Sequence, residues 1–353
     1  MHRRAFVGIF ASFVALLPFG SLLSAADGTR VSGPIVHDNL AIYLVHGTAA
    51  AGTVPLTLQE ALAKGRVKVS ETGSVNELTV ENIGNDEVFI QAGDIVKGGR
   101  QDRVLSVDLL LPPRSGQVAI AAFCVEHGRW TARGNEDGKQ FSSALSSMPS
   151  REARLAMRAY AAEPAPPPAA GINRLNIPIS DVGARQGEIW AKVKETQDRL
   201  SHSVGAPVAA AASPSSLQLS LESEKLKEAQ EAYISALQGA GESGDDVVGY
   251  VFAVNGKINS GDVYASNALF RKMWPKLLAA NVTEAISDKD AAGAAPPSVK
   301  EVEDFLARTA TAAETVRAVN ASVRLATRDG DNSLYAESRR ADDSWVHRNY
   351  LAK

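Results

Sequence analysis

Two apolar runs with a short turn between them constrain the fold of this chain more than any other stretch. The runs cover residues 104–111 and 117–125, and the turn contains Pro112, Pro113 and Gly116. Strand-type runs bounded by proline and glycine predict an antiparallel hairpin. In such a hairpin the start of the first strand lies beside the end of the second. The polar residues at these two outer ends are therefore predicted to meet at one edge of a sheet.

The residues at that edge form a candidate binding site for an anionic group. We predict these ligand-binding residues: Lys97, Gly98, Gly99, Arg100, Gln101, Arg103, Arg129 and Trp130. The glycine pair in this set has two interpretations. Its backbone N–H groups could form an anion-binding nest, although the fingerprints GxxxxGK[ST] and GxGxxG are absent. We favour the alternative, a bulge or tight turn whose charges pair with Asp94, Asp102 or Glu126.

Cys124, Glu126 and His127 raise the question of catalysis. Alternation along a strand places Cys124 and Glu126 on one face and His127 on the other. A nucleophilic Cys–His pair would therefore require His127 to fold back, or another histidine such as His46 to approach Cys124. The alternative, which we favour, is a buried Cys124 with Glu126 in an ion pair with Arg103 or Arg129. Glu126 and Cys124 are the catalytic candidates, and no catalytic residue is assigned.

Pairing across the hairpin predicts one specific contact. Arg103 is expected close to opposite Val125 or Glu126, within a residue or so of register. Arg103 is therefore predicted to contact Glu126 or Glu77 and to be partly buried under Trp130. A buried pair of this kind would cost about 3 kcal/mol to break from one side.

The N-terminus has the pattern of a signal peptide. A basic start at Arg3 and Arg4 precedes an apolar run at 5–17, and small residues at 24–26 offer a cleavage site near Ala26. Residues 1–26 are therefore predicted to direct export to the periplasm or the exterior, with an uncleaved anchor as the alternative. The apolar run is short for a bilayer span, so no stable membrane span is expected after cleavage.

The net charge and the spacing of metal-ligating residues limit which partners and cofactors the sequence predicts. The formal charge of −3 becomes −5 without the two arginines of residues 1–26, which gives no bias toward nucleic acid. The single cysteine excludes an internal disulfide. The histidines show no HxH or HExxH spacing, so neither a metal site nor a cofactor is predicted. A weaker alternative is a carboxylate metal site with these members: Glu71, Glu77, Asp94 and Glu126.

The order of predicted elements indicates an α+β fold. Short strands and one small helix fill residues 27–147, whereas residues 148–353 mix long helices with a few strands. We expect a β-rich core, a sandwich or an open barrel. The long helices should pack on one side of it, and the C-terminal strands should return to it. The two halves are expected to form one folding unit.

Local signals predict several elements. Thr57 and Glu60 form a capping box at the start of the small helix, and Asn255-Gly256 is a hairpin-turn signal. A helix is expected after Ser266. Further helices are predicted at 151–162, 181–203, 217–237 and 298–317, with 131–147 irregular and 205–216 a mobile loop.

Several motifs resemble one bacterial family, the ARG and rhodanese-phosphatase-superfamily-associated proteins. They are Glu71, Asn76-Glu77, the stretches 91–94, 98–103, 112–113, 124–130 and 249–257, and Asp262, Phe270 and Trp274. The family is treated as a domain of unknown function, and its name implies a connection to ADP-ribose or phosphate chemistry. On this basis we predict supporting residues around the site: Glu71, Asn76, Glu77, Gln91 and Asp94.

Three classes of function are compatible with these patterns. We favour an exported module that binds a small molecule or protein through an anionic group, because no catalytic template is satisfied. The alternative is a hydrolase that acts on a phosphate- or ADP-ribose-containing substrate, with Glu126 as catalyst and Gln101 and Arg103 as orienting residues. The third class is a structural protein of the cell envelope.

Overall fold

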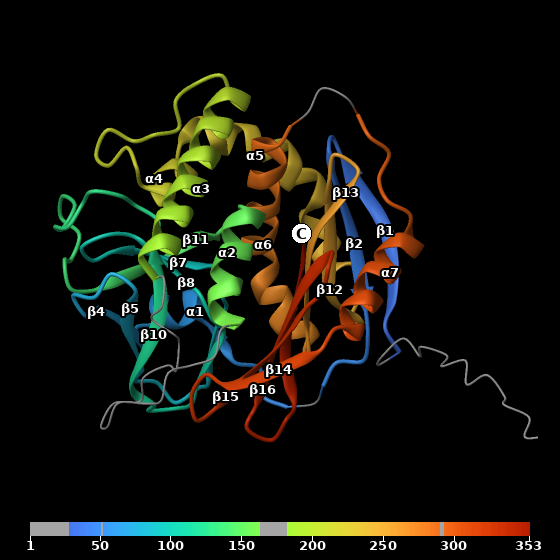
Figure 1. Cartoon of the computed structure of the whole chain (residues 1–353), viewed down its shortest axis with the longest axis horizontal. Coiled ribbons are helices and arrows are strands. Elements are labelled where there is room, and N and C mark those ends of the chain that lie inside the picture. Colours follow the sequence, from blue (N-terminus) through green and yellow to red (C-terminus); the bar gives the residue numbers. More distant parts are fainter. Residues whose placement is uncertain (1–27, 51, 163–181, 290–292) are drawn as a thin grey trace, which may run out of the picture.

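The computed structural model describes residues 28–50, 52–162, 182–289 and 293–353, and the predicted signal peptide lies outside these ranges. The fold is α+β with a β-rich core, as the sequence indicates. Figure 1 shows a helical layer between a curled sheet from the N-terminal half and a large sheet that contains both ends of the described chain. None of the described helices is both long enough and apolar enough to cross a membrane.

The large sheet joins the two halves of the chain. Its strands are antiparallel, and the pairing of Leu44 with Tyr250 is part of the central ladder between the N-terminal and C-terminal segments. In spatial order, the strands are β1 (Arg30–His37), β2 (Leu40–His46), β12 (Val247–Val254), β13 (Lys257–Tyr264), β17 (Trp345–Ala352), β16 (Ser333–Arg340), β15 (Val323–Asp329) and β14 (Glu314–Ala318). The C-terminal strands therefore return to the N-terminal half, as predicted.

The second sheet curls until its two edges approach each other. Its strands are, in order, β11 (Phe141–Ser147), β7 (Asp94–Gly98), β8 (Arg103–Leu105), β10 (Gly116–Cys124), β5 (Glu77–Asn82) and β4 (Val67–Glu71). A bridge between Ser70 and Gln140 and a 2.9 Å hydrogen bond from Glu71 N–H to Lys139 O join β4 to the start of β11. The result is a partly closed barrel, which we call the N-terminal barrel.

Smaller elements complete the layers. A three-stranded sheet holds β3 (Leu56–Thr57), β6 (Val88–Ile90) and β9 (Leu109–Leu111). The helices are α1 (Leu58–Ala63), α2 (Arg151–Ala162), α3 (Val182–Ser203), α4 (Leu217–Leu221), α5 (Glu224–Leu237), α6 (Asn267–Ser287) and α7 (Val299–Arg308). Helix α6 contacts β11 of the barrel and β12 of the large sheet, whereas α7 packs beside β1.

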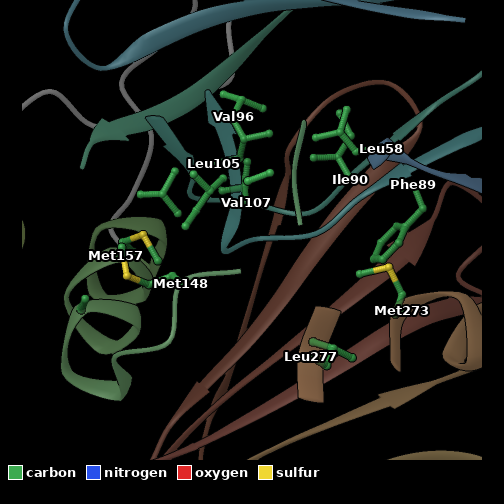
Figure 2. Close-up of a cluster of buried hydrophobic side chains, with 14 of the residues drawn as sticks. Leu58, Phe89, Ile90, Val96, Leu105, Val107, Met148, Met157, Met273 and Leu277 are labelled. Carbon is green, nitrogen blue, oxygen red and sulfur yellow. The ribbon is translucent and has the colours of Figure 1, made fainter. Parts of the chain in front are cut away.

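The main core is continuous across these layers. α6 buries residues on all its sides, including Phe270 and Trp274, because it has a sheet or another helix on every face. Apolar side chains from barrel strands, α2 and α6 belong to one cluster. Figure 2 labels part of this cluster: Leu58, Phe89, Ile90, Val96, Leu105, Val107, Met148, Met157, Met273 and Leu277.

Three local signals are confirmed: the capping box, the hairpin turn and the helix after Ser266. Thr57 and Glu60 form the predicted capping box at α1. Asn255 and Gly256 have φ of 49° and 74°, the left-handed backbone that a tight hairpin turn needs between β12 and β13. Ser266 caps α6 by accepting a hydrogen bond from Leu269 N–H.

The central hairpin is only partly as predicted. The run at 104–111 does not stay beside β10; it divides into β8, which pairs with β10, and β9, which pairs with β6. The division occurs at Ser106–Asp108. The Asp108 carboxylate accepts hydrogen bonds from Ala92 N–H at 2.8 Å and from the hydroxyl of Ser338. These partners draw the chain away from β10 and into the interior.

Four other segments differ from prediction. The segment 131–147 is not wholly irregular, because its end forms β11 with Phe141 buried. The helix predicted at 217–237 is interrupted at Glu222 and Ser223, and α4 is held separately by a 2.9 Å hydrogen bond from Leu217 N–H to Val125 O. The predicted helix 298–317 ends at Arg308, and β-branched residues beyond it join the sheet as β14. Strand β1, an edge strand with a proline, was not predicted.

Candidate functional site

Strand pairing brings the two predicted polar groups to one end of the N-terminal barrel. Arg103 begins β8 and pairs with Cys124, which ends β10. The chain then runs from Glu126 through the loop that contains Trp130 and Arg133, and this loop lies against the strand end. The predicted edge therefore exists, with the register shifted by one or two residues from the predicted one.

Glu126 is the acceptor at the centre of a buried ion-pair network. Its Oε1 accepts a 2.7 Å hydrogen bond from Arg129 Nε, and its Oε2 accepts one of 2.7 Å from Arg129 Nη2. Asp102 N–H donates to Oε2 at 2.9 Å, and Arg133 Nη1 lies 3.4 Å from Oε1. Ser213 donates its hydroxyl to Oε1. We call these residues, with their neighbours Ser216 and Glu136, the Glu126 network.

Asp102 is the second anion of this network. Arg133 contacts both its oxygens at 3.0 and 3.1 Å, and Ser216 donates a hydroxyl at 2.6 Å. Both serines belong to 205–216, which was predicted to be a mobile loop. In the structure this segment is packed onto the barrel, because its hydroxyl groups satisfy buried carboxylates.

The network fixes the charge of Glu126. Burial alone would raise the pKa of this carboxyl, but hydrogen bonds from Arg129, Ser213 and the Asp102 N–H outweigh burial and hold the pKa below its usual value. Glu126 is therefore ionised at neutral pH and committed to structural partners. A general acid or base needs a pKa near the working pH and a free path to substrate.

Cys124 has the properties of a structural thiol. It is fully buried, and its Sγ lies 3.1 Å from Gln101 Oε1. Burial raises the pKa of the thiol to about 11, an effect that the charge of Arg103 only partly offsets. Because the thiolate is the nucleophile, such a thiol is unreactive at neutral pH. The side chain of Gln186 from α3 also bonds the Cys124 backbone N–H and C=O, each at 2.9 Å.

The predicted contact of Arg103 with Glu126 or Glu77 is wrong. Arg103 Nη2 instead lies 3.5 Å from Glu71 Oε2, and Nη1 donates to Gln101 O at 2.7 Å. Glu126 lies beyond the end of β10, where the closer arginines Arg129 and Arg133 take its oxygens. Within the part of the chain that the structure describes, Arg103 Nε and Nη2 are buried and have no hydrogen-bond partner.

Trp130 covers this part of the barrel, as predicted. Trp130 is 40 % exposed, and the guanidinium carbons of Arg103 and Arg100 lie 5.8 and 5.4 Å from the centroid of its ring. Arg100 is exposed, and its backbone N–H donates to Glu71 Oε2 at 3.3 Å. We call Arg100, Arg103 and Trp130 the Trp130 patch.

Gly98 and Gly99 form a tight turn, and Gly99 packs closely against the ring of Phe141. Gly98 N–H donates to Asp102 Oδ1 at 3.0 Å, and Gly99 N–H is directed to backbone carbonyls, including Gln140 O at 3.1 Å. Gly99 has φ +54°, and a Cβ there would lie 2.2 Å from the ring of Phe141. The N–H groups are thus engaged within the chain, in agreement with the turn interpretation. Lys97, also in the predicted set, pairs with Glu222 at 2.7 Å.

The predicted supporting residues fall into two groups. Glu71 and Asn76 lie at the barrel end; Asn76 Nδ2 donates to Ala122 O at 3.3 Å. Glu77 is in β5, opposite Ala121 of β10. Gln91 and Asp94 lie elsewhere, between the barrel and the large sheet, in a second polar cluster that residue spacing does not reveal.

His347 lies fully buried between two carboxylates. Its Nδ1 is 2.8 Å from Asp108 and its Nε2 is 3.0 Å from Asp262, residues that come from three distant parts of the chain. Asp262 also accepts hydrogen bonds from Tyr250 at 2.9 Å and Asn349 at 2.8 Å. We call Asp108, Asp262 and His347 the His347 cluster. Asp108 inside an apolar strand run was a sequence signal for it, because a buried charge requires a partner.

The cluster also joins the motifs that carry the family resemblance. Gln91 Nε2 lies 3.4 Å from Asp262 Oδ1, and Tyr264 donates its hydroxyl to Gln91 Oε1 at 2.5 Å. Asp94 pairs with Lys276 of α6 at 2.5 Å. The N-terminal and C-terminal motifs thus meet in one interior region. Within the described ranges, no group of three or more histidine, cysteine or acidic side chains could hold a metal ion.

The His347 cluster predicts loss of stability at alkaline pH. Burial would lower the pKa of His347, but Asp108 and Asp262 raise it from 6.5 to about 9. A raised pKa means that the contribution is complete below pH 6.5 and disappears as pH rises through 9. We expect the free energy of unfolding to fall by about 3 kcal/mol over this interval.

Urea unfolding at a series of pH values tests this expectation. The pKa of Asp262 is lowered from 3.8, because hydrogen bonding and charge from His347 outweigh burial, so a separate loss should occur as pH falls below that value. The variant His347→Gln should be less stable throughout and should lack the loss between pH 6.5 and 9. A wild-type stability that is constant between pH 6.5 and 9 would contradict a charged His347.

The family description "ARG and Rhodanese-Phosphatase-superfamily-associated Protein domain" matches residues 28–351. Neither the curated proteins nor the solved structures contain a match. The matched range includes both the barrel end and the His347 cluster. The chain therefore belongs to the ARG and rhodanese-phosphatase-superfamily-associated protein family.

Proposed function

We propose that this protein is an exported binding module that recognises an anionic group at the Trp130 patch. The export part of the proposal rests on residues 1–26, whose basic start, apolar run and small residues are typical of a cleaved signal. The protein would then act in the periplasm or outside the cell. The ligand class is a small molecule or protein with a phosphate- or ADP-ribose-like group, and not a nucleic acid.

The observation that carries the proposal is the incomplete hydrogen bonding of Arg103. Its side chain is fully buried; among the described residues, Nε has no hydrogen-bond partner and Nη2 has only the 3.5 Å ion-pair contact with Glu71 Oε2. Leaving a buried donor unpaired costs about 1–3 kcal/mol, so such groups usually satisfy a ligand, an ion or a water. An oxygen acceptor that reached Arg103 beside the Trp130 ring would satisfy these donors.

The rest of the patch suits the same ligand. Arg100 is exposed and can bind an anionic oxygen from outside, and a guanidinium binds phosphate or carboxylate through two parallel hydrogen bonds. The half-exposed Trp130 ring offers a flat apolar surface to a planar group attached to the anion. Arg129, also in the predicted set, is occupied by Glu126 and is assigned a structural role.

The hydrolase alternative has weaker support. It requires Glu126 or Cys124 to exchange protons or attack substrate. Glu126 is ionised within its network, and burial keeps the Cys124 thiol protonated. The observations above therefore favour binding over turnover.

A thermal-shift screen of nucleotides and sugar phosphates tests the proposal. We expect at least one phosphate-bearing compound to raise the melting temperature of the wild type. Arg100→Ala should weaken the affinity for that compound by about tenfold, the effect of losing roughly 1.4 kcal/mol of binding free energy. Trp130→Ala should weaken the affinity further, because it removes both the flat apolar surface offered to the ligand and the ring that covers Arg103.

Controls separate this proposal from the alternatives. Arg114→Ala removes an exposed arginine at the distant β9–β10 turn and should leave affinity unchanged. Turnover of a hit that disappears in folded Glu126→Gln would support the hydrolase instead. The absence of any hit, or hits that are insensitive to Arg100→Ala and Trp130→Ala, would reject the patch and favour a structural role.

A further inference from the structure

Ser32, His46 and Asp246 form a hydrogen-bonded row in the large sheet that shares no residue with the Trp130 patch or the His347 cluster. Ser32 Oγ lies 2.7 Å from His46 Nε2, and His46 Nδ1 lies 3.0 Å from Asp246 Oδ1. A serine and a carboxylate joined through the two ring nitrogens of one histidine are the arrangement of a hydrolytic triad. We call these three residues the Ser32 triad.

Strand register brings the three residues together. Arg30 of β1 pairs with His46, the last residue of β2, and Ser32 lies two positions further along β1, so its side chain is on the same face. On the other side of β2, His46 pairs with Val247, the first residue of β12, and Asp246 directly precedes that residue. Figure 1 shows β1, β2 and β12 side by side in the large sheet. The pairing of β1 with β2 shifts register directly after Ser32, and bulges of this kind are frequent beside active sites.

The partners of His46 determine which ring nitrogen carries the proton. The Asp246 carboxylate can only accept, so a 3.0 Å contact with Nδ1 requires a proton on Nδ1. Nε2 then accepts the hydroxyl proton of Ser32, as a general base must. Arg30 Nη2 also lies 3.2 Å from Nδ1, but it donates to Asp246 Oδ2 at 3.1 Å and so stabilises the same carboxylate. His46 therefore pairs with Ser32 and Asp246, and not with Cys124.

The triad is open to solvent at its nucleophile. Ser32 is partly exposed, whereas the His46 side chain is only 11 % exposed and is held between its two partners. The hydrogen bond with His46 is the main cause that holds the pKa of Asp246 below its usual value, so this carboxylate is ionised at neutral pH. Arg30, with a side chain that is 62 % exposed, places a positive charge beside the triad.

We propose that the Ser32 triad is a second functional site, which hydrolyses small carboxylic esters through an acyl-Ser32 intermediate. Ser32 is the nucleophile, His46 is the general base and acid, and Asp246 is a positioning residue that holds the His46 ring and stabilises its protonated form. Arg30 supplies a positive charge for the oxyanion that develops on the ester carbonyl. This activity goes beyond the binding function proposed above and does not depend on it.

The reaction needs only the ester and water. Ser32 Oγ attacks the carbonyl carbon while its proton passes to His46 Nε2, and the ester C–O bond then breaks as His46 returns that proton to the leaving alcohol. A water molecule next attacks the acyl-Ser32 carbonyl and gives one proton to His46. The bond between the acyl carbon and Ser32 Oγ breaks, and Ser32 recovers its proton from His46 as the carboxylic acid leaves.

Covalent labelling of the wild type tests the nucleophile directly. An alkyl fluorophosphonate reacts with an activated serine: the oxygen bonds to phosphorus, fluoride leaves, and the histidine takes the hydroxyl proton. Mass spectrometry of peptides should show one phosphonate on Ser32 of the folded protein and none after denaturation in urea. A folded protein that is not labelled at Ser32 would overturn the proposal, whatever the outcome of the ligand screen at the Trp130 patch.

Hydrolysis of p-nitrophenyl acetate tests the roles of the three residues. Ser32→Ala should lower kcat/KM by at least about a hundredfold, as should His46→Gln. Asp246→Asn should lower kcat by about tenfold and leave KM unchanged, a split that a purely structural residue would not produce. Circular dichroism checks that each variant folds.

Ser344→Ala is the matched control, because Ser344 is an exposed serine whose hydroxyl donates to Asp342 at 2.6 Å rather than to a histidine. This variant should keep the wild-type rate and the label on Ser32. Hydrolysis that is unchanged in folded Ser32→Ala would reject Ser32 as the nucleophile. If that variant does not fold, the labelling of the wild type decides alone.

Discussion

The fragments 27–166 and 167–353, produced separately, are expected to fail to fold cooperatively. Strand β2 in the first fragment pairs along its length with β12 in the second, so separation exposes the centre of the large sheet. The cut also separates Asp108 from His347 and Asp94 from Lys276, which leaves buried charges without their partners.

Circular dichroism melts of each fragment measure this result. The control is the full chain with a protease site at residue 166, cleaved after folding; it should melt as one unit, because the noncovalent contacts remain. If both isolated fragments give sharp thermal transitions, the two halves are independent domains and the single-unit interpretation is wrong. The expected effect is large, because separation of the fragments removes the folded state as a whole.

Replacement of Glu126 by alanine should reduce the free energy of unfolding by roughly 3–5 kcal/mol, the cost of removing one partner from a buried ion pair. The change leaves Arg129 and Arg133 with Asp102 and Glu136 as the remaining anions of the network. It also removes the acceptor of the Asp102 N–H. The buried guanidinium groups of Arg129 and Arg133 would then both lose one of the carboxylates that balance their charge.

Urea unfolding followed by tryptophan fluorescence measures the change in stability. Glu303→Ala on α7 is a matched control, because Glu303 is exposed, and it should change the free energy of unfolding by no more than about 0.5 kcal/mol. A similar small effect for Glu126→Ala would mean that the network does not hold the barrel end together. The carboxylate would then be free for another role.

Local sequence signals predicted the elements whose structure depends on neighbours in the chain. The capping box of Thr57 and Glu60 and the turn at Asn255-Gly256 require only residues within one turn of each other. Alternating and apolar runs likewise located the strands on either side of the barrel edge. The meeting of the two polar groups at one edge of the sheet was predicted for the same reason, since strand pairing follows from the intervening turn.

Contacts between residues far apart in the sequence determine the features that local signals did not predict. Asp108 divides its apolar run because it contacts His347, which lies 239 positions later. Glu126 pairs with Arg129, whereas Arg103 contacts Glu71, because the chain turns after β10 and brings Arg129 to Glu126. Ser213 and Ser216 lie in an Ala/Pro/Ser-rich segment that was predicted to be mobile, yet their hydroxyls complete the Glu126 network.

The most direct test of the account is a titration of the wild type, observed by NMR, with a phosphate-bearing compound found in the screen. The signals to follow are the Arg103 Nε–H and the Trp130 indole N–H, assigned with the variants Arg103→Lys and Trp130→Phe. We expect saturable shifts of both signals with one common dissociation constant. Saturable binding that leaves both signals unchanged would contradict an anion site at the Trp130 patch.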